Sequence, residues 1–327
     1  ALPISITVKH VATVYHEHAK TIYAEGAKDL ARIKKFTDEI IEHYGDMLAD
    51  KFGPRALKEQ RERWIKADNS RRYCNRLTNG VVRMYKHAVS EELVDQSVWL
   101  RLRSLEPLRA GQTVAKETDP VRPADINIVR ATAPFLSPVL KAMLRIHVAT
   151  GMRPSELCRM RPCDIDRTGE IWMYRPAKHK TAGRGKSRAI PIVGDAQDAL
   201  VDYLNRKSDS YCFSPAESMA WFRAKQKADR KGYGSYRKRK TNPTKSPGAY
   251  YDSGSYRRAI QSAAKQAKVA KWHPYQLRHL AGTIVRDALG PEAAQALLGH
   301  ANLQMTEHYA KISERKAIEA AKHAPKL

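Results

Sequence analysis

Apolar residues recur at every third or fourth position through the first hundred residues, the spacing that gives a helix one apolar face. The pattern holds from Val8 to about Leu105, and no segment there alternates as a strand does. Four helical segments stand out: VATVYHEHAKTIY, DLARIKKFTDEIIEHYGDML, ALKEQRERWIKA and SRRYCNRLTNGVVRMYKHAV. We therefore predict that residues 1–105 form a small helical bundle.

Residues 106–123 lack this period, are mostly polar and contain three prolines, so we interpret them as an interdomain linker. Helical spacing returns over residues 124–327, beginning with one helix expected over 124–151. Two short runs rich in β-branched and aromatic residues, EIWMYRPAKHK and SRAIPIV, flank the turn TAGRGK and predict a β-hairpin. The fold class is therefore mainly α (α+β): an N-terminal helical bundle and a mostly helical domain with a small antiparallel β-sheet.

The composition adds a strong positive charge to this picture. The chain carries 59 Lys and Arg against 34 Asp and Glu, a formal net charge of +25, and +20 of it falls in residues 124–327. A charge of this size indicates a polyanionic partner. Residues 223–245 hold ten basic residues and one acidic residue, which predicts a loop or short hairpin that is either solvated or in contact with phosphates. Its densest part is Arg237, Lys238, Arg239 and Lys240.

The segment 70–89 in the first domain has a second basic surface. A helix there would turn four apolar residues towards the core: Val81, Val82, Tyr85 and Val89. Arg and Asn side chains, which reach phosphates and purine edges, would project from the other side. The candidate DNA contacts are Arg71, Arg72, Asn75, Arg76, Arg83 and Lys86, and an ordinary solvated face is the alternative.

Several classes of protein and site are not expected. No apolar run reaches the length of about 18 residues that a membrane span needs, so we expect a cytoplasmic, nucleoid-associated protein without membrane contact. The chain has no GxxxxGK[ST] or GxGxxG sequence, and no group of His, Cys and Asp has the spacing of metal ligands. We therefore expect no cofactor and no metal.

Four separated motifs in the second half carry candidate chemistry. They are ATGMRPSEL with Arg153, KHKTAGRGK, YQLRHLAGT with Arg278, and LLGHANLQMTEHYAKI with His300 and Tyr309. In this order they resemble the tyrosine recombinase, or phage integrase, family of site-specific DNA recombinases. The resemblance covers residues 124–327, and it extends weakly to the N-terminal helices, which look like the core-DNA-binding domain of that family.

Cleaving a DNA phosphodiester without a metal needs a nucleophile, groups that neutralise the phosphate, and a proton for the leaving 5′-oxygen. Two arginines can hold the non-bridging oxygens in bidentate fashion, and Arg153 and Arg278 fit this role. The alternatives are an ion pair with Glu156 for Arg153 and a surface ion pair for Arg278. The resemblance implies that Tyr309 is the nucleophile and that His300 binds a phosphate oxygen or orients Tyr309.

The general acid in this family is a lysine on the β-hairpin. Lys180, directly before Thr-Ala-Gly, matches that position best, and Lys178 and Lys186 are the alternatives. The resemblance thus assigns the proton for the leaving oxygen to one of these three residues.

One position departs from the family pattern, which usually reads His-x-x-Arg where this chain reads Tyr275-Gln-Leu-Arg278. On a regular helix, positions 275 and 278 lie about 60° apart, whereas 273 and 278 lie about 140° apart. His273 therefore cannot simply replace the missing histidine. Tyr275 can still donate a hydrogen bond to the phosphate through its hydroxyl, but it is a poor base at neutral pH.

The resemblance implies an enzyme that cuts and rejoins double-stranded DNA through a covalent 3′-phosphotyrosyl intermediate. Strand exchange would take place in a homotetramer on two DNA sites, with a dimer on each site, and would integrate, excise or resolve mobile or circular DNA. Two alternatives remain. One is a recombinase-derived DNA-binding protein that does not cleave, which only Tyr275 favours, and the other is a type IB topoisomerase-like relaxase.

Overall fold

The structure is a computed structural model, and it describes residues 6–177, 188–228 and 246–299. The chain forms two compact units, Ala1–Pro120 and Val121–Leu327. The boundary between them falls inside the segment 106–123. Several residues singled out from the sequence lie outside the described residues: Lys178, Lys180, Lys186, Arg237, Lys238, Arg239, Lys240, His300 and Tyr309.

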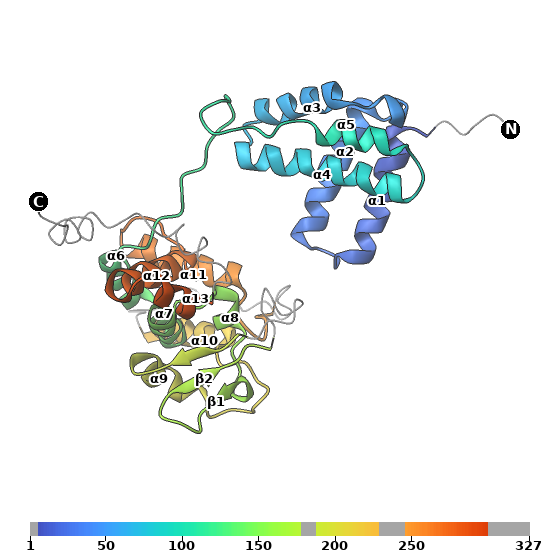
Figure 1. Cartoon of the computed structure of the whole chain (residues 1–327). Coiled ribbons are helices and arrows are strands. Elements are labelled where there is room, and N and C mark those ends of the chain that lie inside the picture. Colours follow the sequence, from blue (N-terminus) through green and yellow to red (C-terminus); the bar gives the residue numbers. More distant parts are fainter. Residues whose placement is uncertain (1–5, 178–187, 229–245, 300–327) are drawn as a thin grey trace, which may run out of the picture. The chain divides into compact units, whose positions relative to one another are not determined.

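The first unit is built from helices, as the apolar period predicts. They are α1 (Val8–Ile22), α2 (Lys28–Tyr44), α3 (Pro54–Lys66), α4 (Arg71–Ser90) and α5 (Gln96–Arg103), with a 3-10 turn at Ala49–Lys51. Helix α1 packs against α2 and α4, and α4 also packs against α3 and α5 (Figure 1). In α4, Val81 and Tyr85 are fully buried, whereas Val82 and Val89 are half-buried. Gly80 allows the close approach to α2, because a Cβ there would lie 2.8 Å from the Phe36 ring.

The first part of segment 106–123 is bound to this unit. The side-chain amide of Asn75 donates to the Leu108 carbonyl and accepts from the Leu108 N–H, both at 2.9 Å. Arg71 forms an ion pair with Glu117, and its backbone N–H donates to the Lys116 carbonyl at 2.8 Å. The segment is therefore hydrogen-bonded to α4 at Leu108, Lys116 and Glu117.

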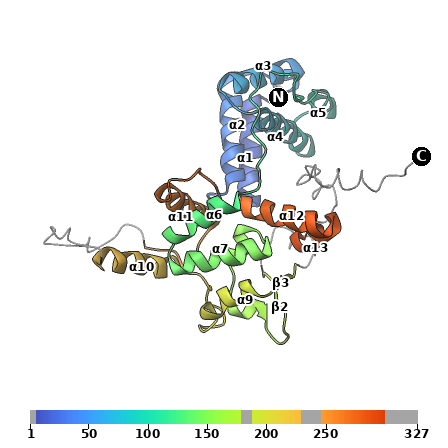
Figure 2. The ribbon, with the colours of Figure 1, turned by 90° about the vertical axis from the view of Figure 1, so that its left-hand side faces the viewer.

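The second unit is mostly helical and contains one small sheet, which confirms the predicted fold class. Its helices are α6 (Ile126–Thr132), α7 (Pro138–Thr150), α8 (Pro154–Cys158), α9 (Asp195–Leu200), α10 (Pro215–Ala228), α11 (Ser253–Gln266), α12 (Tyr275–Leu289) and α13 (Pro291–Leu298), with 3-10 turns at Ala133–Phe135, Pro162–Asp164 and Val201–Tyr203. Helix α7 is central, since it packs against α12 on one side and against α9 and β3 on the other (Figure 2). This packing brings the end of α7 and the first turn of α12 close together.

The sheet has three antiparallel strands in the order β1 (Ile165–Asp166), β2 (Trp172–Tyr174) and β3 (Ile190–Ile192). Strands β2 and β3 pair as the predicted hairpin, with Tyr174 opposite Ile190. Ile190 and Ile192 are buried and Pro191 between them is half-buried, which is the alternation of a strand with one face on the core. Strand β1 was not expected from the sequence.

Two element predictions were wrong in part. The helix expected over 124–151 is interrupted, because α6 ends at Thr132 and α7 begins anew at Pro138, with Ser137 as its capping residue. Proline suits the first turn of a new helix but breaks a continuing one. Residues 223–228, expected in a loop or hairpin, form the end of α10 instead. Ala, Lys and Gln in this stretch are strong helix formers, so the helix continues through them.

Candidate functional site

Arg153 lies at the turn that connects α7 to α8. Helix α7 ends at Gly151, whose φ of 58° is left-handed, and a Cβ there would lie 2.9 Å from the Ala281 Cβ of α12. Arg153 is the residue before Pro154, the first residue of α8. The turn between α7 and α8 therefore lies beside α12.

The Glu156 carboxylate holds Arg153 in place. It is 1% exposed, and it accepts from the backbone N–H and from Nη1 of Arg153, both at 2.8 Å. The ion pair considered as an alternative role for Arg153 is therefore present. The Arg153 side chain is still 18% exposed, so the same contact orients a guanidinium that remains partly accessible.

His147, in the last turn of α7, contacts the same turn through Met152. It is fully buried, and its Nε2 lies 3.0 Å from the Met152 carbonyl. Burial, together with the charge of Arg278, lowers the pKa of His147 to about 3. The ring is therefore neutral, and because a carbonyl only accepts, Nε2 donates to Met152. The residue directly before Arg153 is thereby fixed to α7.

Arg278 lies in the first turn of α12 and is 1% exposed. Its Nη1 donates to the Gly151 carbonyl at 2.8 Å and its Nη2 to the Leu298 carbonyl at 2.6 Å. The guanidinium thus joins the end of α7 to the end of α13. Such burial excludes the surface ion pair that was the alternative for this residue.

The carboxyl end of α13 receives a second arginine that the sequence analysis missed. Arg188 lies two residues before β3, is 9% exposed, and donates from Nη2 to the Leu297 carbonyl at 3.0 Å. The last carbonyls of a helix lack intrahelical partners and carry partial negative charge, so cations are favourable there. Two successive carbonyls of α13 therefore bind two arginines.

Arg188 also interacts with the other charged groups of the site. Its burial and the positive charges of Arg278 and Arg153 lower the pKa of Arg188 to about 10, against the opposing effect of Glu156. Arg188 thus lies within electrostatic range of Arg153, Arg278 and the buried Glu156 carboxylate. We refer to Arg153, Arg188, Arg278 and Glu156 as the arginine cluster. Chemically, it is a partly accessible, positively charged site that suits a phosphate with several charged oxygens.

Tyr275 begins the same helix as Arg278 but is 41% exposed. Its ring meets the buried ring of His279 edge to face, with centroids 5.1 Å apart. Within the described part of the chain, its hydroxyl has no hydrogen-bond partner. His273 precedes the helix, and its backbone N–H donates to the Gln276 side chain at 2.9 Å. Burial and the charge of Arg257 lower the pKa of His273.

Comparison with known proteins gives the cluster its context. Residues 127–316 match the model of the phage integrase family, which is more than half of the chain. The chain belongs to the phage integrase family. The structure places two of its expected site residues, Arg153 and Arg278, in one cluster.

Among curated relatives, the tyrosine recombinase XerC of Corynebacterium glutamicum is 28% identical over 181 residues, which is 55% of this chain and 48% of the relative. The tyrosine recombinase XerA of Pyrococcus furiosus is 27% identical over 176 residues, which is 54% of this chain and 51% of that protein. These matches span about half the length of each relative.

Solved structures share the fold of this family member. A Tn1549 transposon integrase in complex with circular intermediate DNA has a TM-score of 0.67 and 17% identity, over 97% of this chain and 99% of that one. A lambda integrase dimer bound to a core site has a TM-score of 0.65 and 16% identity, over 93% and 77%.

A basic groove of about 520 Å³ lies between α1, α2 and α4 of the first unit. It contains four of the six residues singled out on α4: Arg72, Asn75, Arg76 and Arg83. Arg72, Arg76, Arg83 and Lys86 are exposed. Arg71 and Asn75 are half-buried and bind Glu117 and Leu108, so they hold the segment after position 106. The available basic groups are thus fewer than the sequence indicated.

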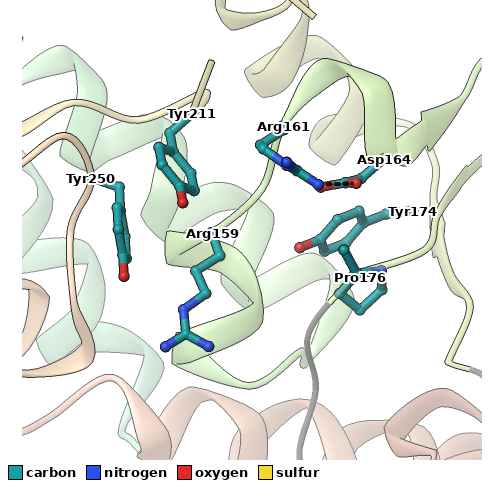
Figure 3. A pocket seen from close by; sticks show the side chains of 8 residues that line it. Arg159, Arg161, Asp164, Tyr174, Pro176, Tyr211 and Tyr250 are labelled. Carbon is teal, nitrogen blue, oxygen red and sulfur yellow. Dashed lines mark hydrogen bonds and ion pairs between the residues drawn. The ribbon is translucent and has the colours of Figure 1, made fainter. Parts of the chain in front are cut away.

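The second unit of this integrase-family chain also has a smaller pocket, of about 250 Å³ (Figure 3). The rings of Tyr211 and Tyr250 lie on one side with centroids 4.3 Å apart, and the Arg161–Asp164 ion pair lies on another. The Arg159 guanidinium has no hydrogen bond or ion pair with any other described residue. Sequence reasoning passed over this position, because it lies among several arginines in RPSELCRMR.

The described residues contain neither a candidate metal site nor a helix that could cross a bilayer. No group of three or more His, Cys, Asp and Glu side chains there could hold a metal ion. No described helix is both long enough and apolar enough to cross a bilayer.

Proposed function

We propose that this protein is a site-specific recombinase that cuts and rejoins double-stranded DNA through a covalent 3′-phosphotyrosyl intermediate. The observation that carries the proposal is the arginine cluster, in which Arg153 and Arg278 converge from α8 and α12. Their positions are set by Glu156, Gly151 and Leu298, through four hydrogen bonds to carboxylate and carbonyl oxygens. These contacts hold both guanidinium groups in defined orientations before DNA binds.

The reaction follows from the residue types. The Tyr309 oxygen attacks phosphorus, the bond from phosphorus to the 5′-oxygen breaks, and Lys180 donates a proton to that oxygen. The products are a 3′-phosphotyrosine and a free 5′-hydroxyl, and attack by another 5′-hydroxyl reverses the step. Keeping a tyrosine ionised at neutral pH costs about 4 kcal/mol, three pKa units at 1.36 each. The positive arginine cluster would offset part of that cost, and His300 would orient Tyr309 or bind the phosphate.

The proposed partners are a DNA duplex and further copies of this chain, a dimer on each site and a tetramer on two sites. A lambda integrase structure with the same fold is a tetramer bound to a Holliday junction, which supports this assembly. The proposed duplex contacts are Arg72, Arg76, Arg83 and Lys86 in the first unit and Arg237, Lys238, Arg239 and Lys240 in the second. We propose the cytoplasm, at the nucleoid, as the place of action.

The test is a trapping experiment on DNA that the protein itself selects from random sequence. In a duplex nicked near the cleavage position, the short fragment that carries the free 5′-hydroxyl dissociates after the cut. The reverse step is then impossible, so the covalent protein–DNA adduct accumulates. We expect an adduct with the native protein and none with Tyr309→Phe. Tyr275→Phe is the matched control, since it removes another exposed tyrosine hydroxyl but should still give the adduct.

Products separate the remaining functions. Recombinant junctions between two sites support a recombinase, whereas relaxed circles alone would indicate a relaxase. Tyr275 at the usual histidine position favours a third candidate, a DNA-binding protein that does not cleave. Tight binding of the selected DNA without any adduct would support that candidate and refute both enzymes.

A further inference from the structure

Arg188 makes contacts that an ordinary surface arginine does not make. Its Nη2 binds the Leu297 carbonyl, and its Nε is buried without a hydrogen-bond partner among the described residues. Its guanidinium lies directly against Gly299, because a Cβ on that glycine would fall 2.1 Å from Nη1. Gly299 has a φ of 61°, so this close contact occurs at the turn that ends α13.

The position links two chain segments that the proposed reaction uses. In the sequence Arg188 comes two residues after the expected turn at 181–186 and two residues before β3, whereas Gly299 directly precedes residue 300. A single side chain therefore joins the base of the hairpin, which carries the expected general acid, to the end of α13, which leads to the expected His300. The sequence signal for this role is an arginine two residues before an apolar strand.

The charge of Arg188 is poorly compensated. Burial opposes its ionisation, the positive charges of Arg153 and Arg278 add to that effect, and Glu156 is the carboxylate that acts against them. Among the described residues, two arginines and one carboxylate thus act on the buried Arg188, and such an excess of positive charge costs stability unless an anion joins it. A phosphate would supply the missing negative charge, and more of it develops in the transition state of its cleavage.

We propose that Arg188 is a positioning residue of the phosphate site, which fixes Gly299 at the end of α13 and adds a third positive charge behind Arg153 and Arg278. This rests on the proposed function. If Arg188 only capped α13, its substitution would affect stability and not the dependence of cleavage on the phosphate charge. If Arg188 belongs to the phosphate site, its substitution should slow cleavage more on a charged phosphate than on a neutral one.

The experiment measures single-turnover adduct formation on the nicked duplex with saturating protein. Arg188→Gln removes the charge and shortens the side chain, and Arg188→Lys keeps the charge but not the planar fork. We expect a loss of about 100-fold for Arg188→Gln, as for removal of one preorganised donor, with a recovery of at least about 10-fold in Arg188→Lys. Arg145→Gln, which breaks an exposed pair with Asp195, is the matched control and should change the rate less than about 3-fold.

A second substrate distinguishes electrostatics from folding. A methylphosphonate at the cleaved position replaces one charged oxygen by a neutral methyl group, so the loss caused by Arg188→Gln should shrink to less than about 5-fold there. An equal loss on both substrates, or native rates in Arg188→Gln, would overturn the inference while leaving the recombinase intact. If Arg188→Gln does not fold, Arg188→Lys is compared on the two substrates in the same way. No adduct with the native protein would overturn the proposed function and this inference together.

Discussion

Glu156→Gln should destabilise the second unit strongly, because it removes the one carboxylate of the arginine cluster. Glu156 is 1% exposed and accepts two hydrogen bonds of 2.8 Å from Arg153, one from the backbone and one from the guanidinium. A glutamine presents only one acceptor oxygen, so its amide group would face one of the two donors. Arg188 would also lose the negative charge that favours its ionisation.

The magnitude follows from the burial of the pair. Breaking a buried ion pair costs about 3–5 kcal/mol. The Arg153 side chain is 18% exposed, so water screens part of the loss and the lower end, about 3 kcal/mol, applies. For a unit of this size, Val121–Leu327, each kcal/mol lowers the unfolding midpoint by about 2–4 °C. We therefore expect a fall of roughly 6–12 °C.

Calorimetry of the full chain measures this midpoint. The control is Glu217→Gln, whose partner Arg206 lies 3.0 Å away and whose side chain is 41% exposed. Such an exposed pair contributes less than about 1 kcal/mol, so its midpoint should fall by less than about 4 °C. A fall in Glu156→Gln no larger than in the control would refute the view that Glu156 holds the cluster together.

Three further predictions concern DNA binding, pH and the general acid. Arg76→Ala should lower DNA affinity for all sequences and reduce the slope of log affinity against log salt concentration by about 1, whereas the control Asn75→Ala should leave this slope unchanged. Binding titrations at several salt concentrations measure the slope, and equal slopes for the two variants would exclude Arg76 from the duplex contacts. The pKa of His147 is about 3 in the folded chain and 6.5 ordinarily, so between pH 6.5 and 3 only the unfolded chain binds a proton at this residue. The free energy of unfolding therefore falls by about 1.4 kcal/mol for each pH unit below 6.5. Urea unfolding at several pH values should show this dependence of stability on pH in the control His10→Gln but not in His147→Gln. If His147→Gln keeps the same dependence, His147 is not its source. Lys180→Ala should abolish cleavage of ordinary DNA but not of DNA with sulfur as the 5′-leaving atom, since a thiolate leaves without a proton; failure on both would exclude Lys180 as the acid.

Elements with strong local signals could be predicted from the sequence. The apolar period placed the helices of the first unit, and the paired β-rich runs predicted the hairpin that contains Tyr174 and Ile190. The interruption at Ser137 and Pro138 was missed because the apolar period continues across it. The roles of Asn75 and Arg71 were also hidden, since their polar side chains bind a segment whose own sequence looks like a free linker. The apolar period of a sequence indicates which face of a helix is buried, but it does not indicate which polar groups form hydrogen bonds with one another.

By itself, the sequence determined the helical character, the positive charge of the second half and the residue types that a phosphate-cleaving site needs, with Arg153 and Arg278 among them. Only the tertiary structure decided how these residues are held. Arg278 is positioned by the carbonyl oxygens of Gly151 and Leu298, and Arg188 by that of Leu297. Every residue has a backbone carbonyl, so no sequence pattern marks which of them will bind a guanidinium. That choice arises where α7, α12 and α13 pack closely enough to bring helix ends distant in the sequence to one place.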